Sequence, residues 1–303
     1  MQKINIYIGK YFTIILILSG IVGIFLPQPF ISWKASLPYL LGFVLFLSFL
    51  KIDFQELINN FRKIKLICWL IIVPMILLPA ILYLLISPLN QEIAIAFLLI
   101  TAIPSAVASS AMTELFKGNV SISIIVTVLG HLIVPLTIPL LLFILLGRSV
   151  SISLSEIFLF LFKVAVAPFF LSIIVKNIAQ KLIQKTYQYY QSISIISIAI
   201  VLLVAIAINT DAIYSNPWES ALFLLIATAL AIFLHLFGWL ICYKSNREIK
   251  ISSIILVAYN NMALCLLVAI QFFSPRVILM CVAYEVVWTF LPVITKFILP
   301  KVK

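Results

Sequence analysis

Apolar runs of about 20 residues alternate with short polar segments along the chain. This pattern predicts membrane-spanning helices, because a helix needs about 20 apolar residues to cross the hydrocarbon core of a bilayer, whereas barrel strands alternate over about 10 residues. The expected spans lie near residues 11–27, 36–50, 65–87, 92–115, 119–146, 155–175, 189–209, 218–242, 250–272 and 277–299. No connection between them is long enough for a soluble domain. The expected fold is an all-α polytopic membrane protein with ten transmembrane helices.

Polar residues interrupt the fourth and the ninth of these spans. The fourth contains "AIPSAVASSAM" and the ninth contains "AYNNMALC", where the flanking sequence is rich in Leu, Ile and Val. A loosened backbone in a membrane must be buried in protein or line a cavity, because lipid offers no hydrogen bonds. We therefore expect both spans to be broken helices at a transport site. A proline kink packed on small residues is the alternative.

The two halves of the chain, 1–150 and 151–303, contain five expected spans each. The segments "FKGNVSISIIVTVLGHLIVP" and "FSPRVILMCVAYEVVWTFLP" share three residue types at identical spacing, and each follows an interrupted span. The matching residues are Phe116, Val120 and Pro135 in the first and Phe273, Val277 and Pro292 in the second. An odd number of spans per unit makes the two units inverted relative to each other. Inverted five-helix repeats with matching broken helices are typical of secondary transporters.

Composition and charge agree with a membrane protein. Hydrophobic residues make up 65% of the chain and charged residues only 10%, against about a quarter charged in a soluble domain. The net charge of +11 is not read as a nucleic-acid surface, because most Lys and Arg lie in short loops beside the spans. Loops after even-numbered spans hold eleven of them and loops after odd-numbered spans hold three. The positive-inside rule then places both termini in the cytoplasm.

The stretch from Pro104 to Thr127 follows the pattern P-x-x-x-A-S-x-x-M-T-x-L-x-x-G-N-V-x-x-S-x-x-x-T. With "FLSFLKIDFQEL", "NNMALCLLVA" and Val287-Trp288, this pattern resembles the bile acid:sodium symporter family. The resemblance implies a panel domain of spans 1, 2, 6 and 7 and a core domain of spans 3–5 and 8–10, with spans 4 and 9 crossing. It also implies a multi-pass protein of the inner or plasma membrane that carries organic anions, either bile acid-like or small carboxylates, by alternating access.

The same resemblance suggests cation ligands and also a departure from the family pattern. Matching positions for one sodium site are Ser109, Ser110, Ser123 and Thr127. Leu256 stands at the acidic position of the ninth span, and Pro74 stands where a glutamine is expected in the third span. Neutral hydroxyls alone should bind a hard cation weakly. Coupling to two sodium ions is therefore not expected; the candidate coupling ions are Na⁺ and H⁺, and no other cofactor is expected.

Ionisable residues within the spans are candidates for coupling, because they are costly in lipid. His131 shares a helix face with Ser123 and Thr127, while Lys163 and Glu285 each lie about eight residues into a span. The alternative for Lys163 is a structural pair with a carboxylate, and the alternative for Glu285 is a structural ion pair or hydrogen bond. His235 has no polar neighbours in the sequence and is expected to be structural.

The amides of Asn260 and Asn261, with Pro104 at the other break, are the candidates for contact with the substrate. An amide can donate to a carboxylate and can also satisfy backbone groups freed by a break. The competing interpretation is that these amides only form hydrogen bonds with the backbone groups freed by the break.

Four other functions compete with cation-coupled anion transport. An enzyme is not expected, because neither H-E-x-x-H nor G-x-S-x-G occurs. A channel and a proton-coupled or uncoupled facilitator remain alternatives. An efflux carrier of the arsenite or auxin type shares the inverted-repeat plan, but the break in the fourth span contains serines and no cysteine.

Overall fold

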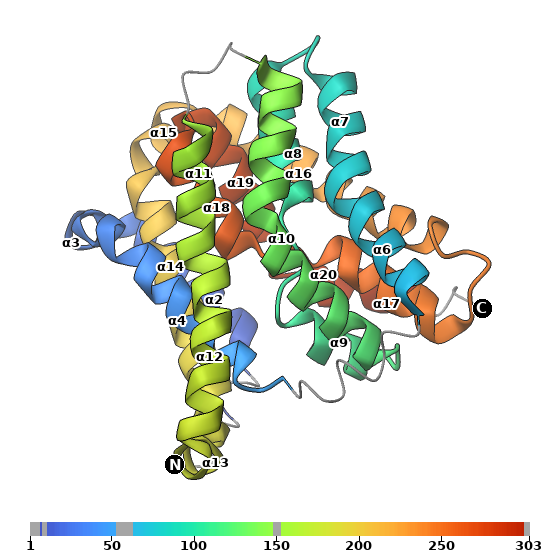
Figure 1. Cartoon of the computed structure of the whole chain (residues 1–303). Coiled ribbons are helices and arrows are strands. Elements are labelled where there is room, and N and C mark those ends of the chain that lie inside the picture. The colour runs from blue at the N-terminus through green and yellow to red at the C-terminus, as the bar shows by residue number, and fades with distance from the viewer. Residues whose placement is uncertain (1–6, 8–10, 53–62, 148–152, 300–303) are drawn as a thin grey trace. The chain divides into compact units, whose positions relative to one another are not determined.

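The computed structural model describes residues 7, 11–52, 63–147 and 153–299. Over these ranges the chain is helical, with short π and 3₁₀ turns and no strand (Figure 1). The one extended contact described is an isolated antiparallel bridge between Ser105 and Asn260. The expectation of an all-α protein is confirmed.

The chain divides into two compact units, each built from two separate stretches. Unit 1 comprises Met1–Ile52 and Phe160–Pro217, and unit 2 comprises Asp53–Leu159 and Trp218–Lys303. Each unit therefore takes residues from both halves of the sequence.

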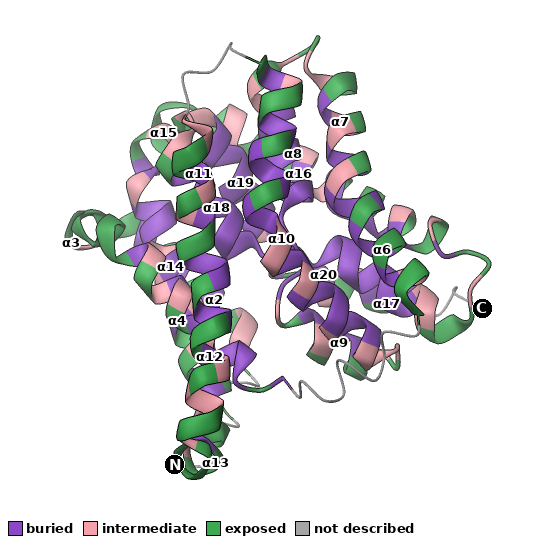
Figure 2. Cartoon of the chain, in the orientation of Figure 1, coloured by how far each residue is buried: buried purple, intermediate pink, exposed green. Residues whose placement is uncertain are grey.

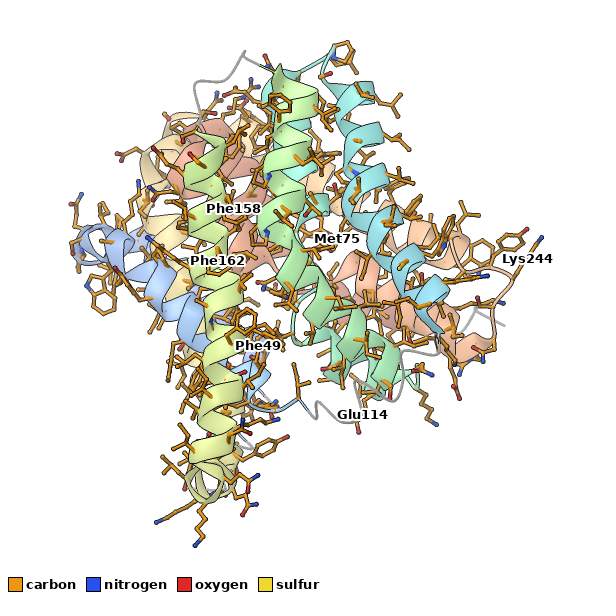
Figure 3. The ribbon with its side chains drawn as sticks, in the orientation of Figure 1. Phe49, Met75, Glu114, Phe158, Phe162 and Lys244 are labelled. Carbon is orange, nitrogen blue, oxygen red and sulfur yellow. The ribbon has the colours of Figure 1, made fainter. Side chains whose placement is uncertain are left out.

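Unit 1 is held together by the close approach of its first and last long helices. Its described elements are α2 (Phe12–Phe25), α3 (Gln28–Ile31), η1 (Ser32–Ser36), α4 (Leu37–Phe49), η5 (Phe162–Val166), α12 (Ala167–Ile178), α13 (Gln180–Thr186), η6 (Tyr187–Tyr189), α14 (Tyr190–Ile208) and α15 (Thr210–Ser215). α14 packs against both α2 and α4. The Phe49 ring, labelled in Figure 3, meets the Phe169 ring of α12 edge to face, with centroids 5.4 Å apart.

Unit 2 contains both interrupted spans. Its elements are α6 (Ile64–Ile72), η3 (Val73–Leu77), α7 (Leu78–Ile86), α8 (Gln91–Ala102), α9 (Ser109–Leu115), α10 (Val120–Leu146), α16 (Pro217–Leu240), α17 (Arg247–Ala258), α18 (Met262–Phe272), α19 (Pro275–Trp288) and α20 (Leu291–Ile298). The boundary between the units falls inside α11 (Leu154–Leu161) and again at the start of α16.

Six continuous helices in the described ranges are long and apolar enough to cross a membrane. They are Gln28–Phe49, Ile64–Ile86, Val120–Leu146, Leu154–Ile178, Gln180–Ile208 and Pro217–Leu240, and they coincide with the expected spans 2, 3, 5, 6, 7 and 8. α19 and α20 would form a seventh, bent by 57°. Several apolar helices of this length indicate an integral multi-pass membrane protein.

The fourth and ninth expected spans are each built from two half-helices. α8 and α17 both have twelve residues and a length of about 18 Å, too short to cross a bilayer core of about 30 Å alone. Each begins with an asparagine N-cap, Asn90 or Asn246, whose side chain accepts a hydrogen bond from the third residue of its helix. Counted along the sequence, the separation between the first residues of α8 and α17 equals the separation between their last residues.

Three of the four half-helices are buried on all sides over most of their length. Every residue from Ala94 to Ala102, from Ile251 to Ala258 and from Met262 to Ile270 is buried, and Figure 2 shows α17 and α18 as mainly buried. α7 and α16, in contrast, expose large apolar side chains such as Leu85 and Leu225. An all-round apolar helix belongs in a protein interior, so the interrupted helices form the centre of unit 2.

Ion pairs join the N-terminal ends of three helices in unit 2. Arg276 of α19 contacts Glu219 of α16 at 2.6 Å and Glu92 of α8 at 3.3 Å. Ser274, the N-cap of α19, donates to the other oxygen of Glu92 at 2.5 Å. These two ion pairs are the only ones within the described ranges. The cluster fixes α8, α16 and α19 to one another at one end of unit 2.

The packing of α2 on α14 predicts opposite effects for two glycines of α2. A Cβ at Gly23 would lie 2.7 Å from the Leu203 carbonyl oxygen, whereas a Cβ at Gly20 would meet only the mobile end of Ile206 at 3.3 Å. We expect Gly23→Ala to lower the unfolding free energy by about 1–3 kcal/mol through overpacking. Gly20→Ala, the control, should be neutral or stabilising, because Ala favours helix. Thermal unfolding in detergent checks the pair; equal effects would contradict this packing.

Candidate functional site

The breaks of the two interrupted spans pair with each other through their backbones. The Ala106 amide donates to the Tyr259 carbonyl at 2.6 Å, and the Asn261 amide donates to the Pro104 carbonyl at 2.8 Å. These bonds flank the antiparallel bridge between Ser105 and Asn260. In Figure 1, α8 to α9 and α17 to α18 run in opposite senses through this region. We call the paired segments Ile103–Ala108 and Ala258–Asn261 the crossing.

Each segment of the crossing supplies hydrogen bonds that the other has lost. The Tyr259 carbonyl accepts a second bond, from the Ser109 hydroxyl at 3.2 Å, and the Ile100 carbonyl near the end of α8 accepts the Asn260 side-chain amide at 2.7 Å. The Ala258 carbonyl faces the Tyr284 hydroxyl at 3.4 Å. Helix ends leave carbonyl groups without partners, and these contacts replace the partners that lipid cannot provide.

The two predicted amides have different tasks at the crossing. Asn260 ties the α17–α18 break to α8 through its bond to Ile100. Asn261 is the N-cap of α18, and its side-chain oxygen accepts from the Leu264 amide at 3.2 Å. That bond fixes the orientation of the amide, so that its Nδ2 points to Nε2 of His131 at 2.9 Å.

His131 joins α10 to the crossing as a neutral imidazole. Its Nδ1 lies 2.8 Å from the Thr127 carbonyl oxygen, which can only accept, so Nδ1 carries the hydrogen. Nε2 then accepts from Asn261. A second proton on the ring would place two donors face to face. The ring is fully buried, and in this arrangement it positions Asn261.

α10 approaches the crossing more closely than a side chain would allow. A Cβ at Gly130 would lie 2.9 Å from Cβ of Pro104 and 3.2 Å from the sulfur of Met75, which Figure 3 labels. Pro104 is itself buried. Gly130 therefore lets helix α10 rest directly on the first break.

Two of the four predicted cation ligands, Thr127 and Ser123, lie in small groups of hydroxyls, and a third, Ser109, joins one group through its carbonyl. The Thr127 hydroxyl pairs with Ser105 at 2.7 Å, and the Ser123 hydroxyl pairs with Thr113 at 2.7 Å. Thr113 donates to the Ser109 carbonyl at 2.8 Å, so Ser123 must be the donor in the Ser123–Thr113 pair. The fourth, Ser110, is only partly buried and bonds within its own turn, to the Val107 carbonyl.

The chemistry of these groups suits a weakly bound hard cation. They offer neutral hydroxyl and carbonyl oxygens, and Leu256 and Pro74, both buried, lie where the resemblance expects an acid and an amide. In the described ranges, no three His, Cys, Asp or Glu residues are grouped closely enough to hold a metal ion. Ser105 and Thr113 were not predicted, although Ser105 directly follows Pro104 and Thr113 follows Ser109 by one helical turn.

A second polar chain holds the other side of the α17–α18 break. The Tyr259 hydroxyl lies 2.8 Å from the Thr295 hydroxyl, which lies 2.8 Å from Nε2 of His235. Nδ1 of His235 donates to the Ala231 carbonyl at 2.7 Å. The bonds therefore run from Tyr259 to Thr295 to His235 to Ala231. His235 has no polar neighbours in the sequence, and the fold brings it a polar partner from α20, far along the chain.

Lys163 and Glu285 differ in their surroundings. Lys163 lies in the π-helical turn η5 of unit 1 and is exposed. Glu285 of α19 is 2% exposed. Neither residue takes part in the ion pairs found among the described residues, so the structural pair considered for each is not supported. Glu114 and Lys117 are exposed after the first break, and Figure 3 shows the Glu114 side chain extending outward.

The contacts of Asn261 predict that it contributes more than a helix cap. Asn261→Ala removes both the cap of α18 and the donor to His131, which should together lower the unfolding free energy by about 2–4 kcal/mol. Asn246→Ala is the matched control, because it removes the equivalent cap of α17 at an exposed position and should cost about 1 kcal/mol. Thermal unfolding compares the two. A similar loss in both would contradict the role of Asn261 at the crossing.

Comparison with known proteins gives related transporters. "Uncharacterized sodium-dependent transporter YocS" of Bacillus subtilis (strain 168) is 26% identical over 220 residues, which cover 70% of this chain and 66% of that protein. "Sodium/bile acid cotransporter 7-A" of Xenopus laevis and "Sodium/bile acid cotransporter 7" of Xenopus tropicalis are each 25% identical over 180 residues. Those matches cover 57% of this chain and 51% of each frog protein.

A family model with the description "Sodium Bile acid symporter family" matches residues 38–216. This region is more than half of the chain and includes the Pro104–Thr127 pattern, the first break and all four predicted hydroxyl ligands. The members of this family are transporters and not enzymes. The chain belongs to the sodium bile acid symporter family.

Proposed function

We propose that this protein is a secondary transporter that carries organic anions across the membrane by alternating access, with its substrate site at the crossing. The observation that carries the proposal is the pairing of two interrupted helices, break to break, at the buried centre of unit 2. Broken helices that meet within the membrane are typical of substrate sites in secondary transporters.

The proposal includes ten spans arranged as two inverted repeats. α8 and α17 have equal lengths, equivalent asparagine caps and equivalent positions before a break. The long helix that follows each interrupted span, α10 or α19, directs a side chain to the crossing. The side chain is His131 in α10 and Tyr284 in α19. These similarities support two copies of one structural unit. Because the paired segments run in opposite directions, one copy is inverted relative to the other.

An organic anion fits the crossing for two reasons. The N-terminus of α18 starts there, and a helix N-terminus carries a partial positive charge that favours anionic groups. The surrounding residues of α8, α17 and α18 are almost all apolar, which suits the carbon skeleton of a bile acid or a small carboxylate. In this proposal unit 2 carries the site and unit 1 acts as the panel.

Sodium is the first candidate for the coupling ion, bound by the hydroxyls of Ser109, Ser123 and Thr127. The names of the related transporters refer to sodium, and neutral oxygens can bind a hard cation weakly. The proton is the second candidate, because unit 2 holds the buried carboxyl of Glu285.

The test is uptake of radiolabelled cholate and pyruvate into proteoliposomes under an inward sodium gradient, compared with potassium. We expect saturable accumulation of at least one of them in the wild type. Thr127→Val should lose any stimulation by sodium, because it removes a ligand oxygen. Thr137→Val, on the same helix but bonded within its own turn, should keep it. If neither anion accumulates under a sodium or a proton gradient, the proposed function is wrong.

A further inference from the structure

The carboxyl group of Glu285 is unusual among the charged side chains of this protein. Within the described ranges it is the only Asp, Glu, Lys or Arg that is buried. Its Oε2 atom has no hydrogen-bond partner. Such a group is costly in an apolar interior unless it is paired or neutral, and buried unsatisfied groups in native proteins often have a function.

The helix of Glu285, α19, packs on α18 and α8. The helices α19, α18 and α8 hold one positive charge, Arg276 at the start of α19, and it is already paired with Glu219 and Glu92. Besides Arg276 and Glu92, the titratable side chains of these three helices are Cys281 one turn before Glu285, Cys265 of α18 and the neighbouring Tyr284. The two thiols lie 3.8 Å apart and are fully buried, and the buried part of α8 from Ala94 to Ala102 contains no titratable side chain.

A buried carboxyl group without a neighbouring positive charge is stable only when it is neutral, and it becomes neutral by binding a proton. An ionised carboxylate at this position would have neither a cation nor a complete set of donors, and the free-energy cost of burying it would be large. A membrane carboxyl that gains and releases a proton is a common device in proton relays of transporters.

The helical turn that contains Glu285 touches the crossing directly. The preceding residue, Tyr284, places its hydroxyl 3.4 Å from the Ala258 carbonyl. Trp288, three residues later, meets the Tyr259 ring edge to face with centroids 6.0 Å apart. A change in the charge of Glu285 would therefore act on the α17–α18 break through both neighbours.

We propose that Glu285 is a proton-binding site of unit 2 and that it couples anion transport to protons. The coupling rests on the proposed function, whereas the proton site can be tested by itself. The carboxylate binds one proton to become a carboxylic acid while it is enclosed in unit 2, and it returns that proton to water when the surroundings open.

The first test compares the infrared spectra of the wild type and Glu285→Gln, recorded as the difference between acidic and alkaline buffer. We expect the wild type to show the C=O band of a protonated carboxyl in an apolar environment, and Glu285→Gln to lose it. Glu114→Gln, an exposed control, should retain the band. If the variant does not fold, labelling of the wild type with a hydrophobic carbodiimide should modify Glu285 in peptide mass spectrometry. No band and no labelling would overturn the proton site.

The second test measures cholate and pyruvate uptake without sodium, under an inward proton gradient. The wild type should be stimulated by the gradient and Glu285→Gln should lose that stimulation while still exchanging the anion. Equal stimulation of both proteins would overturn the coupling but leave the proposed function intact. If the wild type transports neither anion under any gradient, the proposed function and the coupling fail together, and the infrared comparison still decides the proton site.

Discussion

The need to satisfy backbone hydrogen bonds inside a membrane governs the centre of this protein. A helix that stops midway exposes carbonyl and amide groups, and lipid has no partners for them. Here two interrupted helices solve this problem together, because Pro104, Ala106, Tyr259 and Asn261 exchange backbone bonds. Each break is stable only in the presence of the other, which explains why small residues and amides replace Leu and Ile at both places.

The same pairing makes the crossing a meeting point for several helices. α10 reaches it through His131, α19 through Tyr284, and α16 and α20 through the chain from His235 to Thr295 and Tyr259. Both histidines are oriented by a carbonyl at Nδ1 and accept at Nε2. Polar networks of this kind specify one arrangement when every member is satisfied. A substrate bound at the crossing would therefore be sensed by most of unit 2.

The local sequence pattern predicted where the helices and breaks lie, but it did not predict which residues form hydrogen bonds across the fold. The long helices and both breaks lie where apolar runs and polar interruptions place them, and Pro104 and Asn260 mark the breaks. These hydrogen-bond partners could not be predicted from local pattern, because Thr295 is 60 positions from His235 and Ser109 is 150 positions from Tyr259. Ser105 was overlooked because a hydroxyl next to a proline has many possible roles. The division into two units also depends on packing between distant segments. The orientation of the termini stays a prediction, because it rests on the distribution of Lys and Arg between the loops alone.

Disulfide formation between Ser105→Cys and Asn260→Cys, with the four native cysteines replaced by alanine, tests the crossing most directly. The flanking bonds make this a non-hydrogen-bonded antiparallel pair, with Cα atoms about 4.5 Å apart, within the range of about 4.4–6.8 Å that a disulfide spans. We predict efficient cross-linking in membranes on mild oxidation, and none for Thr137→Cys with Asn260→Cys. Cross-linking no greater than in this control would show that the two breaks do not meet.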